Sequence, residues 1–129
     1  MIKSELSKFI KEEAFKIGFD KIGISKPEII GDESKNLDLW FENGNHAEME
    51  WIKNRRDERI DIKKYYPDAK SIIALAVNYF TGKNQDQIKS GFKFSSYAWG
   101  DDYHLVIKEK LKLLLHQIKN YNSVIDGIA

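Results

Sequence analysis

Apolar residues recur with helical spacing near both ends of the chain. In residues 3–18 they fall at i, i+3 and i+4 positions, with Lys and Glu on the other face, and Gly18 follows as a helix-ending glycine. The same period returns over residues 102–120 and predicts the most regular helix of the chain. Shorter apolar faces predict two further helices, over residues 34–43 and 46–54.

The remaining segments favour strands and loops. Residues 19–24 alternate between apolar and polar positions and predict a short strand. The nearly continuous apolar run of residues 70–79 is typical of a central strand covered on both faces. Residues 81–92 have loop composition, and residues 94–99 predict another strand or an extended segment.

The order of these elements predicts a mixed α/β (α+β) fold. We expect one domain, residues 1–129, in which a small central sheet is flanked by amphipathic helices. Residues 124–129 resemble a turn that enters a new strand, so we expect the sheet to be incomplete at the C-terminus and the domain to be truncated. Uncovered strand edges and apolar faces would then favour self-association.

Composition narrows the class of protein. A hydrophobic content of 42% and a formal net charge of +1 exclude intrinsic disorder and argue against nucleic-acid binding by bulk charge. The absence of cysteine excludes disulfides, thiol catalysis, iron–sulfur ligation and cysteine-based zinc sites within these residues. Charges interrupt the first helix, so residues 3–18 predict neither a signal peptide nor a membrane span, and the cytoplasm is the expected compartment.

Two segments carry candidate chemistry. Residues 53–64 hold six basic and three acidic side chains, which a solvated surface or a binding surface would explain. Residues 95–104 gather hydroxyls, aromatic rings, two acids and a histidine ahead of a helix. In one interpretation, Asp101 or Asp102 caps that helix. In the other, the N-terminus of the helix presents hydrogen-bond donors and the His104 imidazole to a ligand.

The other histidines and the common motifs point to no metal or nucleotide site. The three histidines have no ligand spacing; we expect a structural role for His116 and a capping or surface role for His46. The sequence contains no zinc-protease helix, phosphate-binding loop or dinucleotide fingerprint.

Four blocks together resemble the N-terminal domain of epoxyqueuosine reductase, the cobalamin-dependent enzyme of tRNA queuosine biosynthesis. They are IGFDKIGIS, GNHAEMEWIKNRRDERIDIKKYYPDAKSII, ALAVNYF and SSYAWGDDYHLVIKEKLKLLL. The family usually shows G-x-M-x-[WY], an Arg before a proline-led strand, and then [SC]-x-Y-A-x-G-x-D-Y-H. The first block is kept with Ala47 where glycine is common, and the last motif is intact from Ser95 to His104.

The resemblance implies an oxidoreductase of tRNA processing whose cofactors are shared between domains. The family's first domain binds cobalamin together with the segment after it. Cysteines further along bind two 4Fe–4S clusters, and a helical repeat module helps to hold tRNA in many members. Since this chain has no cysteine, it binds no cluster, and we expect both the iron–sulfur and the helical-repeat domains to be absent from it.

The matched positions give the candidate site residues. By resemblance, Arg59 and Ser95 would contact cobalamin, and three residues would line the substrate side, with His104 as a donor: Asp102, Tyr103 and His104. The family's proton-donor aspartate lies in a V-D-[ST] strand after the last helix. Asp126 is a possible match, but the preferred alignment places that acid beyond Ala129, so we expect no activity from this chain alone.

Two alternatives remain open. The chain would act as a non-catalytic binding or interaction module with the same fold, or it would belong to a related cobalamin-dependent reductase that acts on another substrate.

Overall fold

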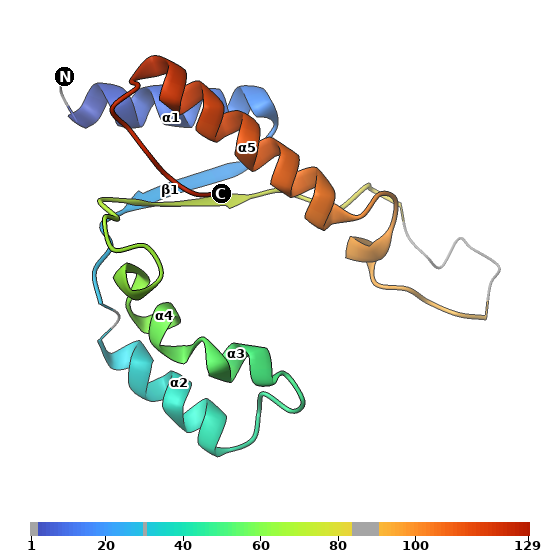
Figure 1. Ribbon diagram of the computed structural model, residues 1–129. Helices are drawn as coiled ribbons and strands as arrows, with labels where there is room; N and C mark the ends of the chain where they lie inside the picture. The colour runs from blue at the N-terminus through green and yellow to red at the C-terminus, as the bar shows by residue number, and fades with distance from the viewer. Residues whose placement is uncertain (1–2, 30, 84–90) are drawn as a thin grey trace. The chain divides into compact units, whose positions relative to one another are not determined.

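The computed structural model describes residues 3–29, 31–83 and 91–129, and these form two compact units (Figure 1). One unit combines Met1–Gly23 with Ala74–Ala129, and the other is the continuous segment Ile24–Ile73. The predicted mixed α/β class is confirmed, because helices accompany a small sheet of two antiparallel strands.

Strands β1 (Lys21–Ser25) and β2 (Ile72–Ala76) form this sheet. Next to the paired strands, the Asp20 backbone N–H donates to the Ala76 carbonyl oxygen at 2.9 Å. The strand predicted within residues 70–79 is confirmed as β2, but the prediction that it is covered on both faces is wrong. Within the described residues β2 pairs with β1 alone, and its side chains are half-buried or exposed.

In the discontinuous unit, α1 (Lys3–Ile17) packs against α5 (Tyr103–Tyr121), and Figure 1 shows the two helices side by side. Their contact buries apolar side chains at helical spacing: Ile10, Ala14, Leu114 and Ile118. The rings of Phe9 and Tyr121 stack with centroids 4.0 Å apart. Gly18 ends α1 with a φ of 95°, as predicted, whereas Phe15 on the same helix is 54% exposed.

The continuous unit contains short helices: α2 (Asp32–Glu42), α3 (Glu50–Asn54), α4 (Arg56–Ile60) and the 3-10 helix η1 (Ile62–Lys64). The helix predicted over residues 46–54 begins only at Glu50. Ala47 has a φ of 48°, in the left-handed region, and a right-handed helix cannot pass through such a residue. Residues 46–49 therefore form turns.

Two further predictions differ from the structure, and a third is tested only in part. The strand or extended segment expected over residues 94–99 contains instead the 3-10 helix η3 (Ser96–Ala98), because the Ala98 and Trp99 N–H groups bond locally to the Ser95 and Ser96 carbonyls. The strand expected at residues 124–129 is absent, and a turn between Asn122 and Ile125 leads into irregular chain. Of the predicted loop over residues 81–92, residues 84–90 lie outside the described part.

Among residues 3–29, 31–83 and 91–129, no helix is both long and apolar enough to span a membrane.

Candidate functional site

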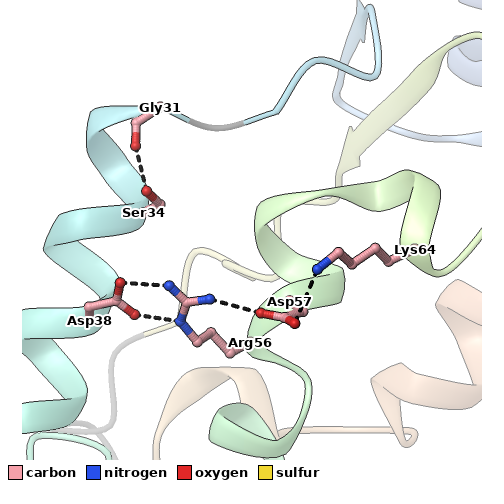
Figure 2. Close-up of polar contacts among 6 residues, drawn as sticks. All are labelled: Gly31, Ser34, Asp38, Arg56, Asp57 and Lys64. Carbon is pink, nitrogen blue, oxygen red and sulfur yellow. Dashed lines mark hydrogen bonds and ion pairs between the residues drawn. The ribbon is translucent and has the colours of Figure 1, made fainter.

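A network of ion pairs fixes α4 to α2 within the continuous unit (Figure 2). The Arg56 guanidinium donates to both carboxylate oxygens of Asp38, with Nη2 to Oδ2 at 2.6 Å, and its Nη1 donates to Asp57 at 2.8 Å. Lys64 donates to the other Asp57 oxygen at 3.1 Å. A bidentate guanidinium pair has a defined orientation, so the network sets the direction of α4, which carries Arg59.

The same contacts shift the acids and the base of the network. The hydrogen bond from Arg56 holds the pKa of Asp38 below its usual value, and bonds from Lys64 and then Arg56 do the same for the pKa of Asp57. The hydrogen bonds to Asp38 and Asp57 raise the pKa of Arg56. All three groups are therefore charged over the physiological pH range.

The predicted basic excess of residues 53–64 separates into paired and unpaired cations. Besides Arg56 and Lys64, Arg55 is paired, at 3.5 Å from Glu58. Within the described part of the chain, three cations have no ion pair: Lys53, Arg59 and Lys63. The local positive charge available to a ligand therefore lies on these side chains.

Arg59 lies over an aromatic ring. Its guanidinium carbon is 5.5 Å from the centroid of the Trp51 ring, which is 60% exposed. Arg55 lies in the same way over Tyr65, at 5.9 Å. Trp51 ends the G-x-M-x-[WY] block of the sequence, but its contact with Arg59 was not predicted.

Ser95 immediately precedes η3 in the discontinuous unit. Its backbone carbonyl accepts from the Ala98 N–H at 2.9 Å, and its side chain makes no capping hydrogen bond. Ser95 is exposed, so its hydroxyl is available to a ligand.

The N-terminus of α5 brings Asp102 and His104 together. The Asp102 Oδ1 atom accepts from the His104 backbone N–H at 2.9 Å, which is the predicted helix cap, and lies 2.9 Å from the His104 Nδ1 atom. Since a carboxylate only accepts, Nδ1 carries the proton in this contact, and Nε2 is not used by it. The bonds from the backbone and then the side chain of His104 lower the pKa of Asp102.

Two tyrosines complete this end of α5. The Tyr103 ring stacks on the His104 ring with centroids 4.0 Å apart, and the Tyr97 ring meets Tyr103 edge-on at 6.0 Å. Tyr97 and Tyr103 are 53% and 43% exposed, so this is an accessible aromatic surface next to an oriented imidazole.

Asp126 is held by a different contact. Its Oδ1 atom accepts from Lys119 Nζ at 2.6 Å, and the carboxylate is largely exposed. The structure therefore brings Asp102, Tyr103 and His104 together, and it places Asp126 beyond the opposite end of α5. Arg59 belongs to the other unit.

The prediction of a capping or surface role for His46 is wrong. It is only 7% exposed and packs edge-on against Phe41 at 5.4 Å, beside Trp40. Its Nε2 atom is 3.4 Å from Glu50, while Nδ1 has no hydrogen-bond partner among the described residues. The aromatic pair at the end of the preceding helix, Trp40 and Phe41, was the sequence signal for this core position.

His116, by contrast, is exposed on α5 and lies 3.2 Å from the Asn120 amide nitrogen.

No group of three or more His, Cys, Asp or Glu side chains in the described ranges has a metal-binding arrangement.

Comparisons with known proteins agree on one family. The family model described as "Epoxyqueuosine reductase QueG, DUF1730" matches residues 59–127. Among curated relatives, the epoxyqueuosine reductase of Cellulophaga algicola is 39% identical over 127 residues, which is 98% of this chain and 41% of that protein. That of Cyclobacterium marinum is 35% identical over 121 residues, 94% of this chain and 39% of the relative.

Solved structures give the same result. A crystal structure of epoxyqueuosine reductase with an epoxyqueuosine-modified tRNA-Tyr stem loop matches with a TM-score of 0.75 and 27% identity, over 93% of this chain and 32% of the other. The Streptococcus thermophilus enzyme matches with a TM-score of 0.68 and 33% identity, over 94% and 32%. The chain thus spans about two fifths of the curated relatives it matches. From its sequence and its fold alike, this chain belongs to the epoxyqueuosine reductase QueG (DUF1730) family.

Proposed function

We propose that this chain is the N-terminal, cobalamin-binding part of an epoxyqueuosine reductase that converts epoxyqueuosine to queuosine in tRNA. The observation that carries the proposal is the contact of Asp102 with His104 at the start of α5, inside the motif shared with the family. Membership of the family and the solved relative with a modified tRNA stem loop support it. The expected partner is the anticodon region of tRNA, and the expected compartment is the cytoplasm.

The residues present fit cobalamin, whose edge carries amides and a phosphate. Arg59 has no ion pair among the described residues, and the Ser95 side chain makes no capping bond, so both offer donors to such groups. When bound, cobalamin supplies the reducing chemistry at its cobalt. Because the chain has no cysteine, the clusters that deliver electrons would be bound by other residues of the enzyme.

We propose that His104 acts on the substrate. Removal of the epoxide oxygen as water consumes two electrons and two protons. Proton donors must therefore lie within hydrogen-bond distance of that oxygen. The contact with Asp102 fixes the imidazole through Nδ1 and leaves Nε2 available to the substrate. Asp102 thus positions His104, while Tyr103 supports the ring by stacking.

Asp126 does not suit the role of proton donor. Its carboxylate is largely exposed and accepts a hydrogen bond from Lys119 at 2.6 Å, so a charged partner already occupies one of its oxygens. This contact supports an acid outside the chain. We therefore propose that the chain alone is inactive. If residues 1–129 alone convert the substrate and Asp126→Asn abolishes that conversion, this assignment is wrong.

The test of the function measures conversion of an epoxyqueuosine-modified tRNA stem loop by the protein as its gene encodes it, loaded with cobalamin and supplied with a reductant. His104→Gln should slow conversion about a hundredfold or more. His116→Gln is the matched control, because His116 is exposed on the same helix and far from the cap; it should convert substrate at the wild-type rate. No conversion by the wild-type protein, or equal rates for the two variants, would refute the proposal.

A further inference from the structure

The end of α5 that carries His104 lies away from the buried contact between α1 and α5. The buried side chains of α5 are Leu114 and Ile118, and both belong to its C-terminal half. Because an α-helix rises about 1.5 Å per residue, His104 lies about 15 Å from Leu114 along the axis. The N-terminal half of α5 extends past the end of α1 (Figure 1). The buried contact alone therefore does not fix the direction of the end that carries His104.

Lys110 makes a polar contact from this half of the helix. Its Nζ atom donates to the Gly18 carbonyl oxygen at 2.9 Å, although the two residues are 92 positions apart in the chain. Nζ also lies 5.8 Å from the centroid of the Phe19 ring, which is only 3% exposed. These contacts place the ammonium group at the C-terminal end of α1, where the peptide dipoles of the helix favour a positive charge.

The backbone to which Lys110 bonds is itself held in place. A Cβ atom at position 18 would lie 3.0 Å from Lys110 Nζ, so the glycine leaves the space that the ammonium group occupies. Two residues further on, the Asp20 N–H donates to the Ala76 carbonyl oxygen at 2.9 Å, and the Asp20 carboxylate accepts from the Asn78 N–H at 2.7 Å. Lys110 thus connects α5 to a junction that α1 and the end of β2 both support.

We propose that Lys110 is a positioning residue that fixes the N-terminal half of α5 and, with it, the His104 imidazole. This inference rests on the proposed function, because it concerns the orientation of the group that acts on the substrate. The contact with Asp102 sets the ring relative to the helix, whereas Lys110 sets the helix relative to the junction after α1. A displacement of about 1 Å at the reacting groups costs about a hundredfold in rate, so a contact remote from the substrate affects the chemistry.

Hydrogen exchange of the protein as its gene encodes it measures the anchoring without any enzymatic activity. Lys110→Met keeps the aliphatic chain and removes the donor, so the amides in the first turns of α5 should exchange about tenfold faster than in the wild type. The amides near Leu114 and Ile118 should change less, because the buried contact with α1 remains. Lys110→Arg retains a charged donor and should restore most of the protection.

Lys112→Met is the matched control. It removes the same charge from the same helix, but Lys112 is exposed and lies two residues along, on the opposite side of α5 from Lys110. This variant should leave both hydrogen exchange and turnover at the wild-type values.

Turnover of an epoxyqueuosine-modified tRNA stem loop by the cobalamin-loaded protein tests the link to His104. At a temperature at which circular dichroism shows the variant to be folded, Lys110→Met should lower kcat about tenfold and leave KM within about twofold. Lys110→Arg should recover most of kcat. In the His104→Gln background, Lys110→Met should lower kcat no further, because Lys110 acts through His104. A lysine that only stabilises the fold would leave the kcat of the folded variant unchanged.

Each result bears on a separate part of the proposal. If Lys110→Met leaves exchange in the first turns of α5 unchanged, or if Lys112→Met accelerates it equally, the anchoring is wrong. If exchange rises while kcat keeps its wild-type value, or if the loss of kcat adds to that of His104→Gln, the positioning role is wrong. If the wild-type protein converts no substrate, the proposed function fails and the positioning role fails with it, while hydrogen exchange still decides the anchoring.

Discussion

Ala47 offers a test of backbone strain in the turn that precedes α3. Its φ of 48° lies in the left-handed region, which costs an L-residue other than glycine roughly 1–2 kcal/mol. A glycine adopts such a conformation without that cost. Ala47→Gly should therefore stabilise the protein.

The size of the effect follows from two opposing terms. Relief of the left-handed strain contributes about 1–2 kcal/mol, and the larger conformational entropy of glycine in the unfolded chain opposes it by about 0.4–1 kcal/mol. The Ala47 side chain is exposed, so its removal sacrifices little apolar contact. The net gain should be about 0.5–1 kcal/mol, or a rise in melting temperature of about 2–5 °C.

Urea denaturation followed by circular dichroism measures this difference, with two variants for comparison. Gly44→Ala should destabilise the protein by a similar amount, because Gly44 has a φ of 67° and open space where a Cβ would lie. Ala74→Gly, in strand β2 with ordinary backbone, should also destabilise by about 0.5–1 kcal/mol. If Ala47→Gly lowers stability as Ala74→Gly does, the left-handed strain is not a significant cost and the reasoning is refuted.

Two further predictions concern α5. Because His104 lowers the pKa of Asp102, the carboxylate contributes stability above its ordinary pKa, and this contribution is lost as the pH falls below about 4. Asp102→Asn, which keeps a capping oxygen, should show a shallower loss of stability between neutral and acid pH in urea titrations; an unchanged pH dependence would contradict the role of the charge. Leu114→Ala, at a core position with 3% exposure, should cost about 2–5 kcal/mol of unfolding free energy. Leu113→Ala, where the side chain is 47% exposed, should change it by less than about 0.5 kcal/mol, and similar losses for both would show that the α1–α5 packing is misassigned.

Sequence patterns predicted the helices and the helix cap that depend on interactions between neighbouring residues. The apolar period placed α1 and α5 to within a residue or two, and the acids before α5 predicted its cap, which the structure assigns to Asp102. The misplaced start of α3 depends on the single backbone torsion of Ala47, which no apolar period reports. Residues 94–99 have strand-forming side chains, but local 3-10 hydrogen bonds satisfy their backbone instead.

In the candidate site, too, neighbouring residues could be predicted from the sequence, whereas contacts between residues far apart in the chain could not. The motif from Ser95 to His104 is contiguous, so its members could be recognised together from the sequence. The support of Arg59 by Trp51 joins residues from two different short helices, and it depends on how the chain turns between α3 and α4. The Asp38–Arg56 pair likewise joins side chains 18 positions apart, beyond the reach of helical periodicity.

The division of the chain into a continuous and a discontinuous unit has a consequence for synthesis on the ribosome. All of Ile24–Ile73 has left the exit tunnel before α5 has been translated, so its short-range contacts can form early. The partner of α1 arrives about a hundred residues later, and closing so long a loop slows its folding. During that interval the apolar face of α1 has no cover, and a chaperone that binds amphipathic helices would encounter it there. Slowed translation between β2 and α5 would prolong that exposure, and aggregation should rise with the length of the pause.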